Sequence, residues 1–284
     1  MNKYIKCINY LITKKTHEIV HHDKSFFQHL INVYNTLRKW ECEEDVCYAG
    51  LFHAIYGNEY FSQQIEKDRN VIKNLIGNKS EIIVFEFTQN RSKNKNTRLV
   101  WLASNLDHDY ICVFDNLLDK QEIDTNYFYF RDIAPWRFIG SGKDETKWRK
   151  FNYHLKFKNK IEKKLKDQTE NILKDMQIFD LLKLERAYAS ANPRGTVHES
   201  HTDWEKEITG ITVMYYLNNA WDLKFAGETV FYDKNKQDIL KSIIPKPGRI
   251  IIFDGNIEHC ARDVRRDLND LRMVLTFKYK LFLN

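Results

Sequence analysis

Two histidines and one aspartate stand at spacings that suit a metal site. His201 and Asp203 lie two residues apart in the segment HESHTDWE, and His259 follows the apolar run GRIIIFDG. Alternate side chains of an extended chain point to the same side, so we expect His201 and Asp203 to share a face. A sheet that folds back on itself would bring His259 beside them. Two imidazoles and one carboxylate form the facial ligand set of non-haem Fe(II) oxygenases, which leaves coordination positions open.

A basic residue further along the chain adds an anion site. Arg272 opens the segment RMVLTFKYK, in which Arg272, Val274 and Thr276 fall on one face of an extended strand. A guanidinium that points into an apolar sandwich must pair with an anion, because an unpaired buried charge is very costly. A dicarboxylate co-substrate would match its fork, and Tyr216 would reach it from a facing strand. The competing candidates for this role are Arg262, Arg265 and Arg266.

These residues lie in a part of the chain that has the periodicity of strands. Apolar, β-branched runs separated by turn residues predict strands over 208–218, 228–233, 248–255 and 272–280. Many short strands in succession favour a sandwich or barrel over a parallel sheet. The preceding segment 144–184 is rich in lysine and predicts long helices that brace one face of the sheet.

The first part of the chain has helical periodicity instead. Apolar residues recur at helical spacing over 26–40, 43–57, 62–77 and 97–117. Gly57 and Gly77 suit the ends of two of these helices. The pattern changes near residue 125, so we expect a helical domain over 1–125 and a strand-rich domain over 126–284.

The composition fits a folded chain without membrane spans. Of 284 residues, 43% are hydrophobic and 14% aromatic, which supports a real core and excludes a disordered chain. The formal charge of +6 is spread thinly and gives no clear sign of nucleic-acid binding. Five scattered cysteines without a CxxC pair argue against disulfides and structural zinc, so a cytoplasmic location is expected. No apolar run approaches the roughly 20 residues of a membrane span, and no signal peptide is expected.

Several segments together resemble the 2-oxoglutarate- and Fe(II)-dependent dioxygenases of the prolyl-4-hydroxylase type. They are HTD, ITVMYYLNNAWD, AGETVFYD, PKPGRIIIFDG, His259 and RMVLTF, in family order over roughly residues 180–280. The resemblance implies an α+β fold: a double-stranded β-helix, or jelly roll, with bracing helices.

The resemblance also implies a role for individual residues. The matched iron ligands are His201, Asp203 and His259. The positions matched to 2-oxoglutarate binding are Arg272, Thr276, Tyr216 and Tyr188. Such an enzyme uses Fe(II) and 2-oxoglutarate, takes O2 and an unidentified small-molecule or peptidyl substrate, hydroxylates a C–H bond, and releases succinate and CO2. The alternative is a jelly-roll binding protein without turnover, but a pure binder has no need of the triad and the arginine together.

The helical half resembles the early helices of HD-type metal-dependent hydrolases. His29 and His53 match two histidine positions, whereas Ala54 and Ser104 stand where that family has aspartates. A binuclear site requires the missing carboxylate charge, so hydrolysis is not expected. We expect an HD-like helical domain that binds or braces. The alternative is a bifunctional protein with a second metal centre, whose candidate ligands are His22, His29, His53 and Asp107.

Overall fold

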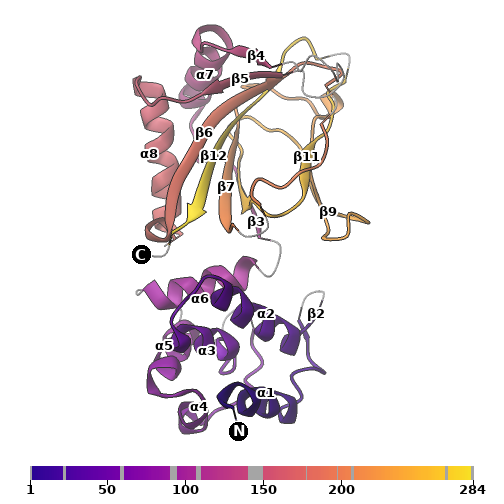
Figure 1. Cartoon of the computed structure of the whole chain (residues 1–284). Helices are drawn as coiled ribbons and strands as arrows, with labels where there is room; N and C mark the ends of the chain where they lie inside the picture. The colour runs from indigo at the N-terminus through magenta and orange to yellow at the C-terminus, as the bar shows by residue number, and fades with distance from the viewer. Residues whose placement is uncertain are drawn as a thin grey trace. The chain divides into compact units, whose positions relative to one another are not determined.

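Two compact units make up the chain, and each forms from its own stretch of sequence. The computed structural model describes residues 2–21, 24–57, 61–89, 95–106, 110–139, 150–176, 178–196, 198–205, 208–265 and 268–282. Contacts divide the chain between Tyr110 and Ile111, with the first unit helical and the second rich in strands (Figure 1). No helix among the described residues is long and apolar enough to cross a membrane.

The first unit is built from amphipathic helices around an apolar core. In helix α2 (Phe26–Lys39), Leu30, Val33 and Leu37 recur at helical spacing and are fully buried. The elements are α1 (Lys3–Thr13), β1 (Val20–His21), β2 (Lys24–Ser25), α2 (Phe26–Lys39), α3 (Glu44–Phe52), α4 (Arg69–Ile76), α5 (Asn78–Thr88) and α6 (Lys95–Leu106).

The expected helices of this unit form, with corrections at their ends. The helix expected over 62–77 begins only at Arg69, because the side chain of Asp68 accepts a hydrogen bond from the backbone N–H of Asn70 and caps the first turn. The helix expected over 97–117 is wrong in its second half. There α6 ends at Leu106, and Ile111–Phe114 forms strand β3 of the second unit.

The second unit contains two antiparallel sheets, as the predicted jelly roll requires. The large sheet has the order β3-β10-β7-β12-β6-β5-β4, and the small sheet has the order β11-β8-β9. The strands are β3 (Ile111–Phe114), β4 (Arg137–Ile139), β5 (Lys150–His154), β6 (Leu182–Asn192), β7 (Gly210–Tyr216), β8 (Thr229–Tyr232), β9 (Ile239–Ile243), β10 (Ile250–Asp254), β11 (His259–Ala261) and β12 (Arg272–Leu281).

An apolar cluster joins the two sheets. Met214, Phe253 and Val274 of the large sheet meet Phe231 and Ile243 of the small sheet, and all five are buried. Alternation along each strand directs these side chains to one face of the sheet, which leaves the opposite face for helices.

Helices α7 (Lys120–Phe128) and α8 (Lys160–Asp175) lie against the outer face of the large sheet (Figure 1). The hydroxyl groups of Thr169 on α8 and Tyr215 on β7 are 2.8 Å apart. Short turns complete the unit: a π-helical turn at Tyr129–Ile133 and 3₁₀ turns at Phe179–Leu181 and Leu223–Phe225. The bracing helices predicted from the sequence are therefore present.

The expectation of long helices over 144–184 is wrong at both ends of that segment. Lys150–His154 forms β5, and β6 begins at Leu182. Ala187, Ala189 and Ala191 alternate with larger residues and are buried on one face of the strand. Small side chains on that face allow the sheet and the bracing helices to approach closely.

A buried carboxylate ties β5 to α8. Glu162 is fully buried and accepts hydrogen bonds from the Tyr129 hydroxyl at 2.6 Å and from the backbone N–H of Phe157 at 2.7 Å. The hydroxyl of Tyr153 on β5 binds the same carboxylate. Burial alone would raise the pKa of Glu162, but these donors outweigh it, and the pKa lies below its ordinary value. The charged carboxylate thus holds β5 in position.

The contact boundary falls earlier than the domain boundary near residue 125 that the sequence suggested. β3 pairs with β10, and its Phe253↔Ile111 register makes it an edge of the large sheet. Asp115 then forms an ion pair with Arg249 at 2.8 Å. Residues 111–125 therefore lie in the jelly-roll unit.

Candidate active site

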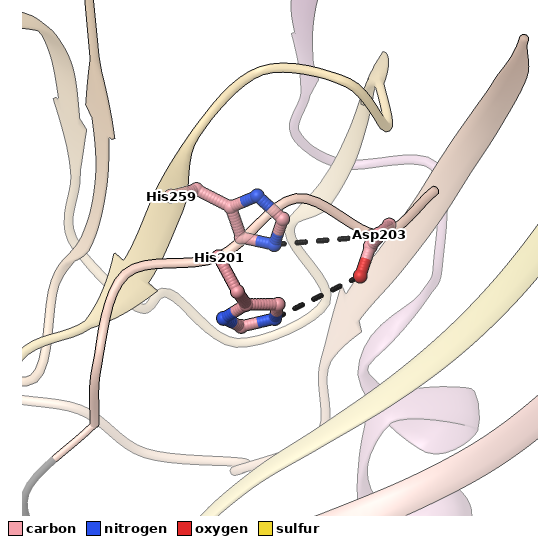
Figure 2. A group of neighbouring side chains, drawn as sticks. All are labelled: His201, Asp203 and His259. Atoms are coloured by element: carbon pink, nitrogen blue, oxygen red, sulfur yellow. Dashed lines mark ion pairs between the residues drawn. The ribbon is translucent and has the colours of Figure 1, made fainter. Parts of the chain in front are cut away.

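His201, Asp203 and His259 converge on one point between the two sheets (Figure 2). The Nε2 atom of His201 lies 3.8 Å from one carboxylate oxygen of Asp203, and the Nε2 atom of His259 lies 3.8 Å from the other. The two imidazole centres are 4.7 Å apart. The side chain of Asp203 is 3% exposed, whereas that of His201 is 42% exposed. The site is therefore open on the His201 side.

Backbone hydrogen bonds hold these residues together. His201 and His259 exchange two backbone hydrogen bonds of 2.9 Å, and the backbone N–H of Asp203 donates to Gly255 at 2.7 Å. The segment 198–205 holds no named strand, and within it His201 forms an isolated bridge to His259 of β11. The expected sharing of a face holds nonetheless, since a bridge also keeps the chain extended locally.

An indole ring fixes the segment after Asp203. A Cβ atom added to Gly210 would lie 2.3 Å from the Trp204 ring, and one added to Gly255 would lie 2.5 Å from it. The two glycines therefore leave the space that the ring fills. Trp204 packs against the ends of β7 and β10 and so anchors the loop that carries Asp203.

Both imidazoles present Nε2 toward the carboxylate. The Nδ1–H of His259 donates to the carbonyl of Ile257 at 2.8 Å, which leaves a lone pair on Nε2 in the neutral ring. Nδ1 of His201 faces the carbonyl of Glu199 at 3.3 Å in the same way. Burial and the neighbouring His259 lower the pKa of His201, which favours the neutral ring that metal binding requires.

Asp203 is held as a carboxylate by two side chains of the large sheet. The Thr212 hydroxyl donates to one oxygen at 2.6 Å, and the ammonium of Lys278 forms an ion pair with the other. Burial would raise the pKa of Asp203, but His259 and Lys278 outweigh it and the pKa is lowered. Lys278 was not among the site residues expected from the sequence. Its position two residues after Thr276, on the same face of the strand, was the available signal.

The three side chains fit an Fe(II) ion. Each offers one ligand atom, and the three atoms all lie within 4.8 Å of one another. Two neutral nitrogens and one carboxylate oxygen suit a borderline divalent metal with open coordination positions. This is the one such cluster found among the residues that the structure describes.

Arg272 is buried in the same region, without a carboxylate partner in the described part of the chain. It is 2% exposed. Its Nε–H donates to the carbonyl of Gly227 at 2.7 Å, and an Nη2–H donates to the Thr229 hydroxyl at 2.9 Å. Burial lowers its pKa. A guanidinium bound only to neutral acceptors retains the capacity to hold an anion.

The competing arginines are placed differently. Arg262 and Arg265 are exposed, and Arg266 lies outside the described residues. The anion site requires a buried guanidinium. Of the described arginines compared here, Arg272 has one.

One cavity connects Arg272 to the triad. Its walls include Arg272, His201, Asp203 and His259. Of the other residues expected to bind 2-oxoglutarate, Thr276 and Tyr188 also line this cavity.

Tyr216 does not line the cavity. Its hydroxyl lies 2.7 Å from that of Thr229 and donates to the carbonyl of Ile243 at 3.0 Å. The guanidinium of Arg272 lies 5.5 Å from the centre of its ring. Tyr216 thus touches the same two residues, Thr229 and Arg272, that form one wall of the cavity.

The helical unit has a histidine pair but no carboxylate beside it in the described residues. The Nε2 atoms of His29 and His53 are 3.2 Å apart, and the Ser104 hydroxyl lies 3.2 Å from that of His53. Two further candidate ligands, His22 and Asp107, lie outside the described residues. No metal-binding cluster is found in the described part of this unit.

Comparison with protein families identifies the strand-rich unit. Residues 187–279 match the family model described as the 2OG-Fe(II) oxygenase superfamily. The predicted resemblance is confirmed for this region, which is a 2-oxoglutarate- and Fe(II)-dependent oxygenase domain. This domain is accordingly a 2-oxoglutarate-dependent dioxygenase, with Fe(II) and 2-oxoglutarate as its cofactors. Residues 10–90 match a domain of unknown function, DUF6817, so the HD-like assignment stays a prediction.

Two prolyl hydroxylases are among the solved structures that match part of this chain. One is the Trichoplax adhaerens prolyl hydroxylase in complex with a hypoxia-inducible factor peptide, at 14% identity and a TM-score of 0.49, covering 62% of this chain and 86% of that one. Another is a Pseudomonas putida prolyl-4-hydroxylase, at 14% identity and a TM-score of 0.48, covering 63% and 96%. No curated protein matches the chain.

Proposed function

We propose that the jelly-roll unit hydroxylates a C–H bond of a substrate that enters beside His201, and that it converts 2-oxoglutarate and O2 to succinate and CO2. In this proposal His201, Asp203 and His259 bind the Fe(II). Arg272 binds the distal carboxylate of 2-oxoglutarate. The bound metal and co-substrate supply the oxidative chemistry, while the protein supplies position and electrostatics.

The protein groups have separable tasks in this reaction. Thr212 and Lys278 orient the carboxylate of Asp203, so that it presents an oxygen to the metal. Thr229 and the carbonyl of Gly227 orient the guanidinium of Arg272.

Three further residues assist at the co-substrate end. Thr276 and Tyr188 line the cavity next to the expected position of 2-oxoglutarate. Tyr216 acts indirectly, through its contacts with Arg272 and Thr229. Its expected direct contact with the co-substrate is replaced by this supporting role.

The observation that carries the proposal is the shared cavity of Arg272 and the triad. A metal site alone would suit many activities, and a buried arginine alone would suit many anions. Together they match a co-substrate that needs a metal at one end and a cation at the other. A binding protein without turnover would need neither the open ligand set nor the buried guanidinium.

Succinate formation tests the proposal. We expect the protein with Fe(II) to produce succinate from 2-oxoglutarate in the presence of O2. Arg272→Ala should raise the KM for 2-oxoglutarate roughly 10- to 100-fold, the worth of a charge-assisted pair, while Fe(II) binding is kept. Arg265→Ala, which changes an exposed arginine of the same loop region, is the matched control.

The proposal fails if the Fe(II)-loaded protein does not bind 2-oxoglutarate. The assignment of Arg272 alone fails if the KM rises in Arg265→Ala and not in Arg272→Ala.

A further inference from the structure

A lysine side chain is buried beside the triad. Lys278 lies on β12, two residues after Thr276, and it is 4% exposed. In the large sheet it pairs in register with Thr212 on β7. Alternation along the strand turns Lys278 to the same face as Thr276, which lines the cavity of the triad. The strand pairing therefore places an ammonium group beside the expected metal site.

The partner of this ammonium is the carboxylate of the triad. Lysine is almost never fully buried without a partner, because removing an unpaired charge from water is costly. Lys278 forms its ion pair with Oδ1 of Asp203, whose side chain is 3% exposed. The ammonium also lies 5.7 Å from the centre of the Tyr188 ring, whose face attracts a cation. Lys278 is thus held as a cation in the interior, because Asp203 balances its charge.

Thr212 and Lys278 hold different oxygens of Asp203. The Thr212 hydroxyl donates to Oδ2 at 2.6 Å, and Oδ2 also faces Nε2 of His259 at 3.8 Å. The ammonium of Lys278 binds Oδ1, which faces Nε2 of His201 at 3.8 Å. The neutral hydroxyl shows that a donor without charge is sufficient to orient a carboxylate oxygen at this place. What Lys278 adds to orientation is a full positive charge.

That charge lies very close to the atoms that would bind the metal. The ammonium contacts Oδ1 of Asp203 directly, and the three ligand atoms of the triad lie within 4.8 Å of one another. A cation and a metal ion on the same carboxylate repel each other, and buried surroundings screen this repulsion weakly. The repulsion grows with the charge of the metal, so it is larger for Fe(III) than for Fe(II). Over a few ångströms, one unit charge changes an equilibrium that adds a second unit charge by more than about tenfold.

We propose that Lys278 tunes the oxidation state of the metal, because its charge favours Fe(II) over Fe(III) at the triad. The inference rests on the proposed function, since it takes His201, Asp203 and His259 as the iron ligands, and it deepens that function. The cofactor is Fe(II), so a site that disfavours Fe(III) keeps a larger fraction of its iron in the active form between turnovers. Oxidation removes one electron from the ion, and Lys278 keeps its proton in both states.

A redox titration of the iron-loaded protein tests this role without co-substrate or turnover. The midpoint potential is measured under argon with mediator dyes, which accept one electron from each ferrous ion. Electron paramagnetic resonance gives the Fe(III) fraction. Lys278→Gln keeps a hydrogen-bond donor and removes the charge. We expect it to lower the midpoint potential, so that the ratio of Fe(III) to Fe(II) at a fixed potential rises by more than about tenfold.

Three further variants separate charge from position. Lys278→Arg keeps the charge and should leave the midpoint potential close to that of the wild type. Thr212→Val removes the other donor to Asp203 without a change of charge, and it should shift the potential much less than Lys278→Gln does. Lys280→Gln removes an exposed charge from the same strand, where water and salt screen it, and should have no effect. Calorimetry with Co(II) and the circular dichroism spectrum measure metal binding and folding in each variant.

The inference holds if the midpoint potential falls in Lys278→Gln and not in Lys278→Arg. It is overturned if Lys278→Gln has the potential of the wild type, or if Lys278→Arg or Thr212→Val lowers it equally. It is also overturned if Lys278→Gln folds but no longer binds iron, which would leave Lys278 with a positioning role alone. Should Lys278→Gln not fold, Lys278→Met makes the same comparison, since its flexible apolar side chain suits burial. Failure of the proposed function is seen separately, when the iron-loaded wild type does not bind 2-oxoglutarate.

Discussion

Each unit of this protein holds a pair of histidines whose rings lie close together. The polar side chain next to the pair differs between the two units. In the jelly roll the imidazole centres of His201 and His259 are 4.7 Å apart, and in the helical unit those of His29 and His53 are 5.0 Å apart. One ring of each pair faces a backbone carbonyl through Nδ1 at 2.8 Å. The backbone therefore orients one imidazole of each pair in the same manner.

The neighbouring polar group decides what each pair can do. In the helical unit the two Nε2 atoms lie 3.2 Å apart, within hydrogen-bond distance of each other. In the jelly roll, Nε2 of both rings faces Asp203 at 3.8 Å, too far for a hydrogen bond and spaced for an ion between them. Ser104 occupies the corresponding place beside His29 and His53. A hydroxyl there adds no negative charge, which a divalent cation requires.

Removing the carboxylate should have the largest effect. We expect Asp203→Ala to weaken Fe(II) binding more than about 100-fold and to abolish succinate formation, since even groups that only orient a ligand are worth 10- to 100-fold. Metal content after dialysis and the circular dichroism spectrum measure binding and folding separately. Asp238→Ala, an exposed aspartate in the β8–β9 turn, is the control. Wild-type turnover in Asp203→Ala would refute the ligand assignment.

Changing the helical pair should alter stability and leave the metal content unchanged. His53 is 2% exposed and packs against the Phe87 ring at 5.0 Å. His53→Ala opens a cavity and removes the contacts of the His53 ring with the Gly50 carbonyl and with His29, so we expect a loss of about 2–4 kcal/mol in the free energy of unfolding. Urea denaturation measures it, with His17→Ala at an exposed position as the comparison. A drop in bound metal would instead reveal a second metal centre.

The smallest expected effect concerns acid stability. The hydroxyl of Tyr10, the backbone N–H of Asp68 and the ammonium of Lys14 lower the pKa of Glu66 from 4.5 to about 2. A lowered pKa in the folded state means that Glu66 stabilises the protein above about pH 4.5 and that this contribution is lost as the pH falls toward 2. Glu66→Gln should therefore lower the free energy of unfolding by roughly 1 kcal/mol at neutral pH, after allowance for screening by water and salt. It should also flatten the dependence of that free energy on pH between 4.5 and 2.

The jelly roll offers a matched change for the acid experiment. Arg249 lowers the pKa of Asp115 to about 2, and Lys246 assists it. Asp115→Asn should flatten the pH dependence of the free energy of unfolding of the second unit over nearly the same pH range. A Glu66→Gln profile as steep as that of the wild type between pH 4.5 and 2 would show that another carboxylate controls the acid unfolding of the helical unit.

Local spacing was sufficient to predict much of the site. His201 and Asp203 are two residues apart, so any extended conformation places them on one side. Arg272 and Thr276 share a face of β12 for the same reason. The strands that carry this site formed close to their expected bounds, because their β-branched and apolar residues favour strands.

Local spacing was not sufficient where neighbours along the sheet decide the outcome. β5 lies in the segment 144–184 that was expected to be helical, β6 begins at the end of that segment, and β3 lies in one expected to extend a helix. The short polar sequence of β5, Lys150–His154, has only a weak preference of its own. Pairing with β12 and β10 and contact with α8 determine the conformation of these strands.

By itself, the sequence determined which residues can share a face and which side chains can bind a metal or an anion, since both follow from covalent spacing and donor chemistry. Only the tertiary structure decided the partners of the buried charges. It set Lys278 against Asp203, brought Lys150 to the cavity wall, and paired His29 with His53 without a carboxylate in the described residues. The physical reason is that the energy of a buried charge depends on what lies within a few ångströms of it, and distant strands and helices supply those neighbours.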